Sequence, residues 1–347
     1  MNNIGNNLKR IRLLNNLSLR EAGKLLNMSA TGISKYENGL IIPNSSKILD
    51  FAKAYKVKAR DILRSYNVPV IKFINFRKDG NINNNTLELL KDIIKNKISD
   101  YLEVISLDNS FNYDGLKKYS CNSYDDIETI ANKFRSDYNL SINQPLSNLI
   151  NILENIGIII ITIQNIDNKF NNFDGFSEII NDIPIIVLLD LDDGARERFT
   201  IVHELGHLIL DINKNLDKEI ACNKFASCFL MPKDCVIKEF GKSRKSISFF
   251  ELLFFKKEYK VSLKAIIHRL KELDIINENL YKSINIFLNQ KKKNNQEIFN
   301  VEKEVSYQFQ RIVYKLENRN IISSSRACEL LGVSMNEKER ENNNYRY

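Results

Sequence analysis

The chain has 347 residues, of which 43 % are hydrophobic and 27 % charged, which is an ordinary globular balance. Its longest apolar run, GIIIITI at 157–163, is far shorter than the ~20 residues that span a bilayer, so no membrane protein is expected. Residues 1–16 lack the apolar core of a secretory signal. The five cysteines show no paired spacings, which predicts free thiols in a cytoplasmic protein.

The positive charge is concentrated near the N-terminus. Residues 1–65 contain twelve Lys and Arg against four Asp and Glu, a net charge of +8. The whole chain also carries +8, so the remaining residues sum to zero. A small basic segment on a neutral body is typical of a nucleic-acid-binding module.

Helical spacing predicts a set of short helices over residues 7–64. Ser18 and Ser29 stand where the N-caps of the second and third helices belong, and a turn falls between those helices at 27–29. The third helix is expected to end at Asn38-Gly39. The residues expected in the core of this unit are Ala22, Ile33 and Leu49.

Two helices about a short turn fit a helix-turn-helix, whose second helix faces the major groove. The run S-x-x-x-I-S-x-x-E-x-G from Ser29 to Gly39 resembles the XRE, or lambda-repressor-like, family, with Leu19 in place of a frequent Gln. The motif and this resemblance predict DNA as a partner, and the docking geometry of such motifs predicts a homodimer on paired half-sites. A helical protein-interaction domain of the same shape is the alternative. The residues expected to face DNA are Ser29, Ala30, Thr31, Ser34 and Lys35.

The middle of the chain is predicted to mix helices and strands. A strand is expected within 68–76 and an amphipathic helix over 86–105. Two further strands are expected at 158–164 and 183–190, with a hairpin turn at Asn181-Asp182. Beyond residue 291 the chain is polar, apart from one helix expected around 324–334.

The segment HELGH places two histidines, His203 and His207, four residues apart on one helix. Because an α-helix has 3.6 residues per turn, both imidazoles point to the same face and can bind one metal ion. Glu204, beside the first histidine, can take a proton from a metal-bound water. The spacing therefore predicts a zinc-metalloprotease site with one Zn²⁺ per chain.

Catalytic zinc commonly has three protein ligands and one open position, so a third ligand must come from elsewhere. The helix expected over 217–230 offers Asp217, Glu219, Cys222 and Cys228, and His268 is the remaining histidine. Glu219 is the first choice because a carboxylate suits catalytic zinc.

Arg196 and Arg198 precede the histidines and could bind a substrate carboxylate, although surface positions are favoured for both.

The run RERFTIVHELGHLIL, followed by KEIACNKFASCFLMP, resembles the ImmA/IrrE family of metallopeptidases. The resemblance covers about 125–285 and implies a minimal gluzincin-like peptidase. Glu219 matches the first Glu of the family's E-x-E pattern and is carried over as third ligand, while Ala221 replaces the second. Several family members cut a partner repressor, which implies a repressor as the protein substrate.

The expected architecture is an all-α helix-turn-helix domain, an α+β zincin-like minimal metallopeptidase domain and a helical C-terminal region. The expected bounds are 1–65, a connecting region at 66–124, 125–285, and a tail at 286–347. The favoured function is a zinc endopeptidase that controls transcription in stress response or mobile-element regulation. The alternative is a DNA-binding regulator whose metal site is sensory or structural.

Overall fold

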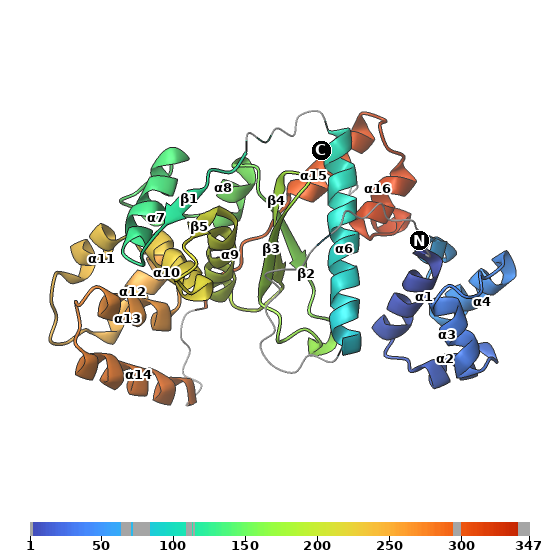
Figure 1. Cartoon of the computed structure of the whole chain (residues 1–347), viewed down its shortest axis with the longest axis horizontal. Helices are drawn as coiled ribbons and strands as arrows, with labels where there is room; N and C mark the ends of the chain where they lie inside the picture. The colour runs from blue at the N-terminus through green and yellow to red at the C-terminus, as the bar shows by residue number, and fades with distance from the viewer. Residues whose placement is uncertain are drawn as a thin grey trace.

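A computed structural model of the chain describes residues 3–63, 71, 84–108, 113, 115–293 and 300–338. Figure 1 shows a helical N-terminal unit at one end, a small sheet near the middle and a group of helices at the other end. Within these described ranges, no helix is both long and apolar enough to cross a membrane. The strand expected within 68–76 lies outside the described residues, apart from Ile71.

Serine caps define the helices of the N-terminal unit. The Ser18 side chain accepts a hydrogen bond from Glu21 N and completes a capping box, and Ser29 accepts one from Gly32 N. These contacts confirm the two expected N-caps. The helices are α1 (Asn3–Leu14), α2 (Leu19–Leu26), α3 (Ala30–Glu37), α4 (Ser45–Ala54) and α5 (Ala59–Leu63).

The core of this unit differs at one position from the expectation. Ala22 and Ile33 are fully buried, as expected, but Leu49 is 62 % exposed. Its neighbours Ile48 and Phe51 point inward instead. The expectation for Leu49 was wrong because several apolar residues of α4 fit a helical spacing, and only the packing of α4 selects which face is buried.

The main sheet has three strands: β2 (Ile159–Ile163), β3 (Gly175–Ile180) and β4 (Ile183–Leu189). β4 lies in the centre, parallel to β2 and antiparallel to β3. Asn181 and Asp182 join β3 to β4 with φ of 51° and 63°, and this pair of positive angles suits a two-residue hairpin turn. The strands expected at 158–164 and 183–190 and the hairpin turn at Asn181-Asp182 are thus confirmed.

The sheet is buried on both faces, because successive side chains of β4 enter two different hydrophobic cores. Ile186 and Leu188 enter a core formed with the helices that follow β4 in the chain. Ile185, Val187 and Leu189 enter a second core on the other face. This second core includes helices α6 (Asn84–Leu107), α15 (Gln308–Asn318) and α16 (Ser324–Leu331).

The first core contains the helices that carry or support the candidate site. Two of them are α9 (Gly194–Ile209) and α10 (Lys218–Leu230), and a two-stranded parallel sheet of β1 (Tyr119–Cys121) and β5 (Leu210–Ile212) lies beside them. The other helices are α7 (Asp126–Asp137), α8 (Leu149–Asn155), α11 (Lys233–Phe240), α12 (Phe249–Tyr259), α13 (Leu263–Glu272) and α14 (Glu278–Lys293).

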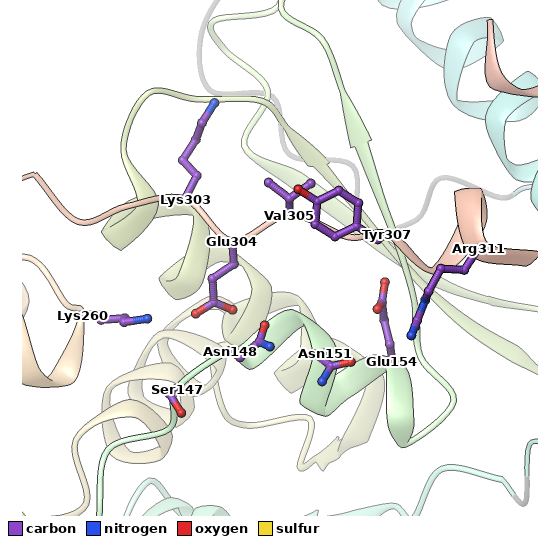
Figure 2. Close-up of a pocket in the computed structure, with 10 residues that line it drawn as sticks. All are labelled: Ser147, Asn148, Asn151, Glu154, Lys260, Lys303, Glu304, Val305, Tyr307 and Arg311. Carbon is purple, nitrogen blue, oxygen red and sulfur yellow. The ribbon is translucent and has the colours of Figure 1, made fainter. Parts of the chain in front are cut away.

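The C-terminal region takes part in the body of the molecule. The helix expected around 324–334 is present as α16, and α15 precedes it as a helix that the sequence analysis did not anticipate. Between α14 and α15, residues 300–307 cross α8 and the start of α9. Figure 2 shows Glu304 from this segment above α8. The domain bounds at 65, 124 and 285 stay predictions.

Candidate functional site

Helix α9 follows β4 after a short turn, and its N-terminus is capped by Asp193. The Asp193 carboxylate accepts hydrogen bonds from Ala195 N at 3.1 Å and Arg196 N at 3.2 Å. Buried apolar side chains along α9 anchor the helix in the first core. This packing carries His203 and Glu204, which are 2 % and 1 % exposed, into the interior next to the sheet.

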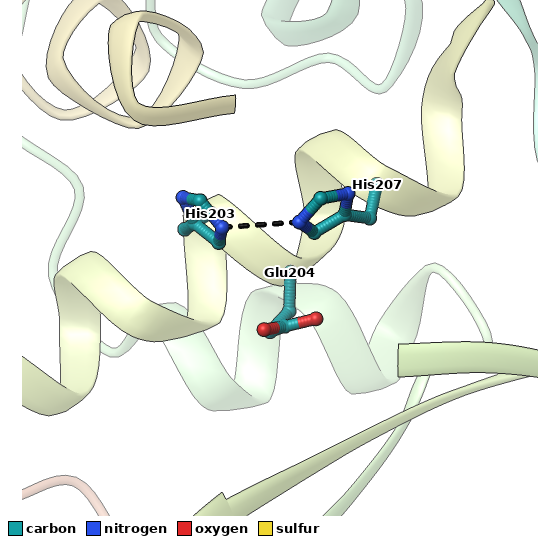
Figure 3. Close-up of side chains that lie close together, drawn as sticks. All are labelled: His203, Glu204 and His207. Atoms are coloured by element: carbon teal, nitrogen blue, oxygen red, sulfur yellow. Dashed lines mark hydrogen bonds between the residues drawn. The ribbon is translucent and has the colours of Figure 1, made fainter. Parts of the chain in front are cut away.

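The two histidines of α9 direct the same ring atom toward one point. His203 Nε2 and His207 Nε2 are 3.1 Å apart, as the dashed line in Figure 3 marks. Glu219 approaches both rings from α10: its Oε2 lies 3.3 Å from His203 Nε2 and its Oε1 lies 3.3 Å from His207 Nε2. The structure therefore brings together the three residues that the sequence analysis proposed as metal ligands.

Local features of α10 hold Glu219 in this place. Asp217 caps the helix by accepting hydrogen bonds from Glu219 N at 2.8 Å and Ile220 N at 3.0 Å. A Cβ added to Gly206 would lie 3.3 Å from both Cβ and Sγ of Cys222. Because glycine occupies this position, α10 can approach α9 closely enough for the Glu219 carboxylate to reach both histidines.

The donor set fits a tetrahedral metal ion. Ligand atoms about 2.0–2.1 Å from a tetrahedral metal stand roughly 3.3 Å from each other. The three separations between these nitrogen and oxygen atoms, at 3.1, 3.3 and 3.3 Å, lie close to that value. Two imidazoles with one carboxylate are a borderline-soft set that suits zinc, and three protein ligands leave a fourth position open.

Glu204 lies on the same helix but is held by different contacts. One carboxylate oxygen of Glu204 and one ring nitrogen each of His203 and His207 lie within 4.8 Å of one another. Ser177 Oγ in β3 donates a 2.6 Å hydrogen bond to Glu204 Oε2. This contact turns the carboxylate toward β3, beside the converging imidazoles, where it could exchange a proton with a molecule held between them.

The sequence analysis missed the two residues of β3 that shape the surroundings of Glu204. A Cβ on Gly175 would meet Glu204 Cγ at 3.1 Å, so glycine leaves space for the carboxylate. Ser177 is two residues further along, on the same face of the strand, and is 1 % exposed. The available signal was the alternation of Gly175 and Ser177 in the segment FDGFS, immediately before an apolar strand.

The other candidates for a third ligand lie in different surroundings. Cys222 Sγ is 3.5 Å from His207 Nδ1, the ring nitrogen opposite the converging Nε2. Cys222 therefore contacts the histidine from behind and orients its ring. Burial raises the pKa of the Cys228 thiol well above its ordinary value, which disfavours the thiolate that binds metal. His268 is exposed on α13.

The two arginines that precede the histidines have different roles. Arg196 is exposed and forms an ion pair with Asp174, just before β3. Arg198 is 1 % exposed, donates to Leu146 O at 2.7 Å and forms an ion pair with Glu304. The surface position expected for Arg198 was wrong, because an ion partner that is distant in sequence makes burial of its charge possible.

The residues expected to face DNA lie on α3 or at its start. Ser29 caps α3, and Ser34 Oγ accepts a 3.1 Å hydrogen bond from Asn38 Nδ2. Thr31 and Lys35 are exposed, while Ala30 is half-buried. A Cβ on Gly23 of α2 would lie 2.5 Å from Met28 O, so the glycine permits the tight turn between α2 and α3. The described geometry is that of a helix-turn-helix with an accessible second helix.

The fold and the site define a helix-turn-helix unit joined to a metallopeptidase-type domain. The family model described as the IrrE N-terminal-like domain, an M78 peptidase family, matches residues 155–271. The helix-turn-helix family model matches residues 8–62. No curated protein matches the chain. The chain thus joins an XRE-type helix-turn-helix domain to an ImmA/IrrE-type peptidase domain, as the resemblance implied.

Proposed function

We propose that the protein is a cytoplasmic zinc-dependent endopeptidase whose N-terminal domain binds DNA, and that it cleaves a repressor-type protein to control transcription. The observation that carries this proposal is the convergence of His203, His207 and Glu219 beside Glu204. A site that only senses or stores metal has no use for a buried carboxylate next to the metal position.

The proposed chemistry assigns one role to each residue. Zinc held by His203, His207 and Glu219 would lower the pKa of a bound water toward ~7 and polarise a peptide carbonyl. Glu204 would act as the general base, accepting a proton at its carboxylate from the attacking water and then returning it to the leaving amine. Ser177 holds Glu204 in position through its 2.6 Å hydrogen bond.

The edge of the sheet offers a place for an extended substrate. β3 forms one edge of the β2-β4-β3 sheet and, in the part of the chain that the structure describes, pairs with β4 alone. A peptide that adds to an edge strand gains main-chain hydrogen bonds that do not depend on its sequence. Ser177 of β3 contacts Glu204, so a peptide at this edge lies next to the general base.

Substitution of Glu204 by Gln tests the proposal. We expect zinc content to stay at one ion per chain, while cleavage of a mixed peptide library falls by about 100-fold or more, because a general base contributes ~10²–10⁴ to the rate. His203→Ala serves as the control that loses zinc. A Glu204→Gln protein that still cleaves at the native rate would contradict the assigned mechanism.

The same variant separates this function from a metal-sensing DNA-binding regulator. If control of transcription depends on proteolysis, the regulatory phenotype disappears in cells that carry Glu204→Gln. A regulatory phenotype that persists in this variant and is lost in His203→Ala would favour a sensory or structural metal site.

A further inference from the structure

A cavity lies on the side of α9 that carries His203, toward the N-terminus of the helix. Its volume is about 460 Å³, and its walls come from α9, the end of α12, the start of α13 and α14. Arg196 and Phe199 of α9 line it, seven and four residues before His203. At 3.6 residues per turn, both point to nearly the same side of α9 as His203.

The distance from this cavity to the metal position suits an extended peptide. With a rise of 1.5 Å per residue, Phe199 and Arg196 lie about 6 Å and about 10 Å along the helix from His203. An extended chain advances about 3.3 Å per residue. A substrate side chain that enters this cavity would therefore belong to a residue roughly two or three positions from the scissile bond.

The cavity is electropositive. Among the described residues that line it, Lys256 and Lys264 carry positive charge, and so does Arg196, which is paired with Asp174 outside the lining. Asp193 contributes a carboxylate, but this group already accepts two N–H groups at the start of α9. The N-terminus of α13, capped by Ser262, also opens onto the cavity and adds the positive end of a helix dipole.

Lys256 is the residue of the cavity that most favours an anionic ligand. It is 8 % exposed, and no carboxylate within the described ranges lies within ion-pair distance of its ammonium group. Burial lowers its pKa, and the nearby charge of Asp193 opposes that shift only in part. A largely buried lysine that lines a cavity without an ion partner within the described ranges is stabilised by an anionic ligand.

The remaining walls suit the stem of a side chain. Phe199, Val261, Leu263 and Leu288 supply apolar surface around the basic groups. A short aliphatic stem that ends in a carboxylate would contact this surface and present its charge to Lys256.

We propose that this cavity is a specificity pocket for an acidic side chain of the protein substrate, and that Lys256 is the specificity-determining residue. The inference rests on the proposed peptidase function, because it treats the occupant as part of a peptide bound across the metal centre. The selected feature of the substrate is then an Asp or Glu two or three residues from the cleaved bond.

Binding of peptide pools tests the pocket without requiring cleavage. The zinc-loaded Glu204→Gln full chain is titrated with heptapeptide pools, blocked at both ends, in which one position is Asp or Asn and the others are mixtures. At one position we expect the Asp pool to bind about tenfold more tightly than the Asn pool, as a charge-assisted hydrogen bond allows. Lys256→Met should abolish the difference, while Lys257→Met, at an exposed neighbour, should retain it.

Cleavage of the same pools by the native chain then locates the scissile bond relative to the preferred Asp. An offset of two or three residues supports the proposal. Equal binding of the Asp and Asn pools, or a preference that survives Lys256→Met, overturns it. If the Asp preference depends on Lys256 but the native protein cuts none of the pools, the pocket stands and the proposed peptidase function falls.

Discussion

The Ser177 hydroxyl donates a 2.6 Å hydrogen bond to Oε2 of Glu204, and this bond links β3 to the reactive face of α9. Both residues are almost completely buried, so water does not compete for the contact. The strand that offers an edge to a peptide therefore also sets the orientation of the proposed general base.

Loss of this contact should slow the chemistry without removing the metal. We expect Ser177→Ala to lower kcat by about 10- to 100-fold, the usual cost of removing a group that orients a reactive residue. Zinc content should be unchanged, because the hydroxyl of Ser177 donates to Glu204, which is not one of the three proposed ligands. Ser99→Ala, which removes a buried hydroxyl on α6, is the matched control. Equal loss of activity in both variants would mean that Ser177 acts only through folding.

The roles of Glu219 and Cys222 can be separated by metal binding. Glu219→Ala should lower zinc affinity by more than about 100-fold, since it removes a ligand, whereas Glu239→Ala, at an exposed site on α11, should not. Cys222→Ala should keep one zinc per chain and lower zinc affinity about tenfold, because its sulfur contacts His207 at Nδ1, the ring nitrogen opposite the converging Nε2.

Cobalt substitution gives an independent readout of the same assignment. A cobalt-loaded native chain should show no sulfur-to-cobalt charge-transfer absorption. Such an absorption that disappears in Cys222→Ala would make Cys222 a ligand and displace Glu219 from the proposed set.

DNA binding through α3 predicts a change in salt dependence. Lys35 is exposed on the second helix of the motif and is expected to contact a phosphate. Lys35→Ala should weaken binding to all DNA sequences and reduce the slope of log K against log salt by about 0.9. Lys257→Ala, on α12 of the peptidase region, should leave the slope unchanged. An unchanged slope in Lys35→Ala would favour a protein-interaction role for the N-terminal unit.

The sequence alone was sufficient for the histidine helix, because i and i+4 spacing fixes two imidazoles on one face regardless of the surroundings. It was also sufficient for β4, whose flanking hairpin turn requires residues that tolerate positive φ. It could not place Arg198, because the burial of that charge depends on Glu304, more than a hundred residues later. Nor could it place Leu49, whose exposure depends on how α4 packs.

The pairing of Arg198 with Glu304 makes the C-terminal segment part of the peptidase fold. Glu304 also accepts a 2.9 Å hydrogen bond from Ile150 N at the start of α8, so one carboxylate contacts both α8 and α9. Figure 2 shows the Glu304 side chain above α8. Glu304→Gln should lower the free energy of unfolding by about 3–5 kcal/mol, because it leaves the Arg198 charge buried without its partner. Glu302→Gln, at an exposed position on the same segment, should change it by less than about 0.5 kcal/mol. Thermal unfolding of the full chain compares the two variants, and similar midpoints would contradict this role.

The buried ion pair of Arg12 and Glu37 should stabilise the helix-turn-helix unit in the same way. Arg12 donates to both Glu37 oxygens, at 2.6 and 2.9 Å, and a third bond reaches Leu17 O at 2.7 Å. Both side chains are buried, so the pair ties α1 to the C-terminal end of α3. Glu37→Gln should destabilise this unit by about 3–5 kcal/mol, since an uncompensated guanidinium stays inside.

Hydrogen exchange of the α1 and α3 amides measures this loss of stability for the N-terminal unit alone. The chain has no Trp whose fluorescence could report it, and circular dichroism would be dominated by the rest of the chain. Asp50→Asn removes one partner of the exposed pair with Lys47 and should cost at most about 0.5 kcal/mol. Replacing Arg12 by Met and Glu37 by Leu together should cost less than Glu37→Gln alone, because no buried charge is then left without a partner. If the loss of stability in the double variant equals the summed losses of Arg12→Met and Glu37→Leu, packing of these side chains, rather than their charges, holds α3 in place.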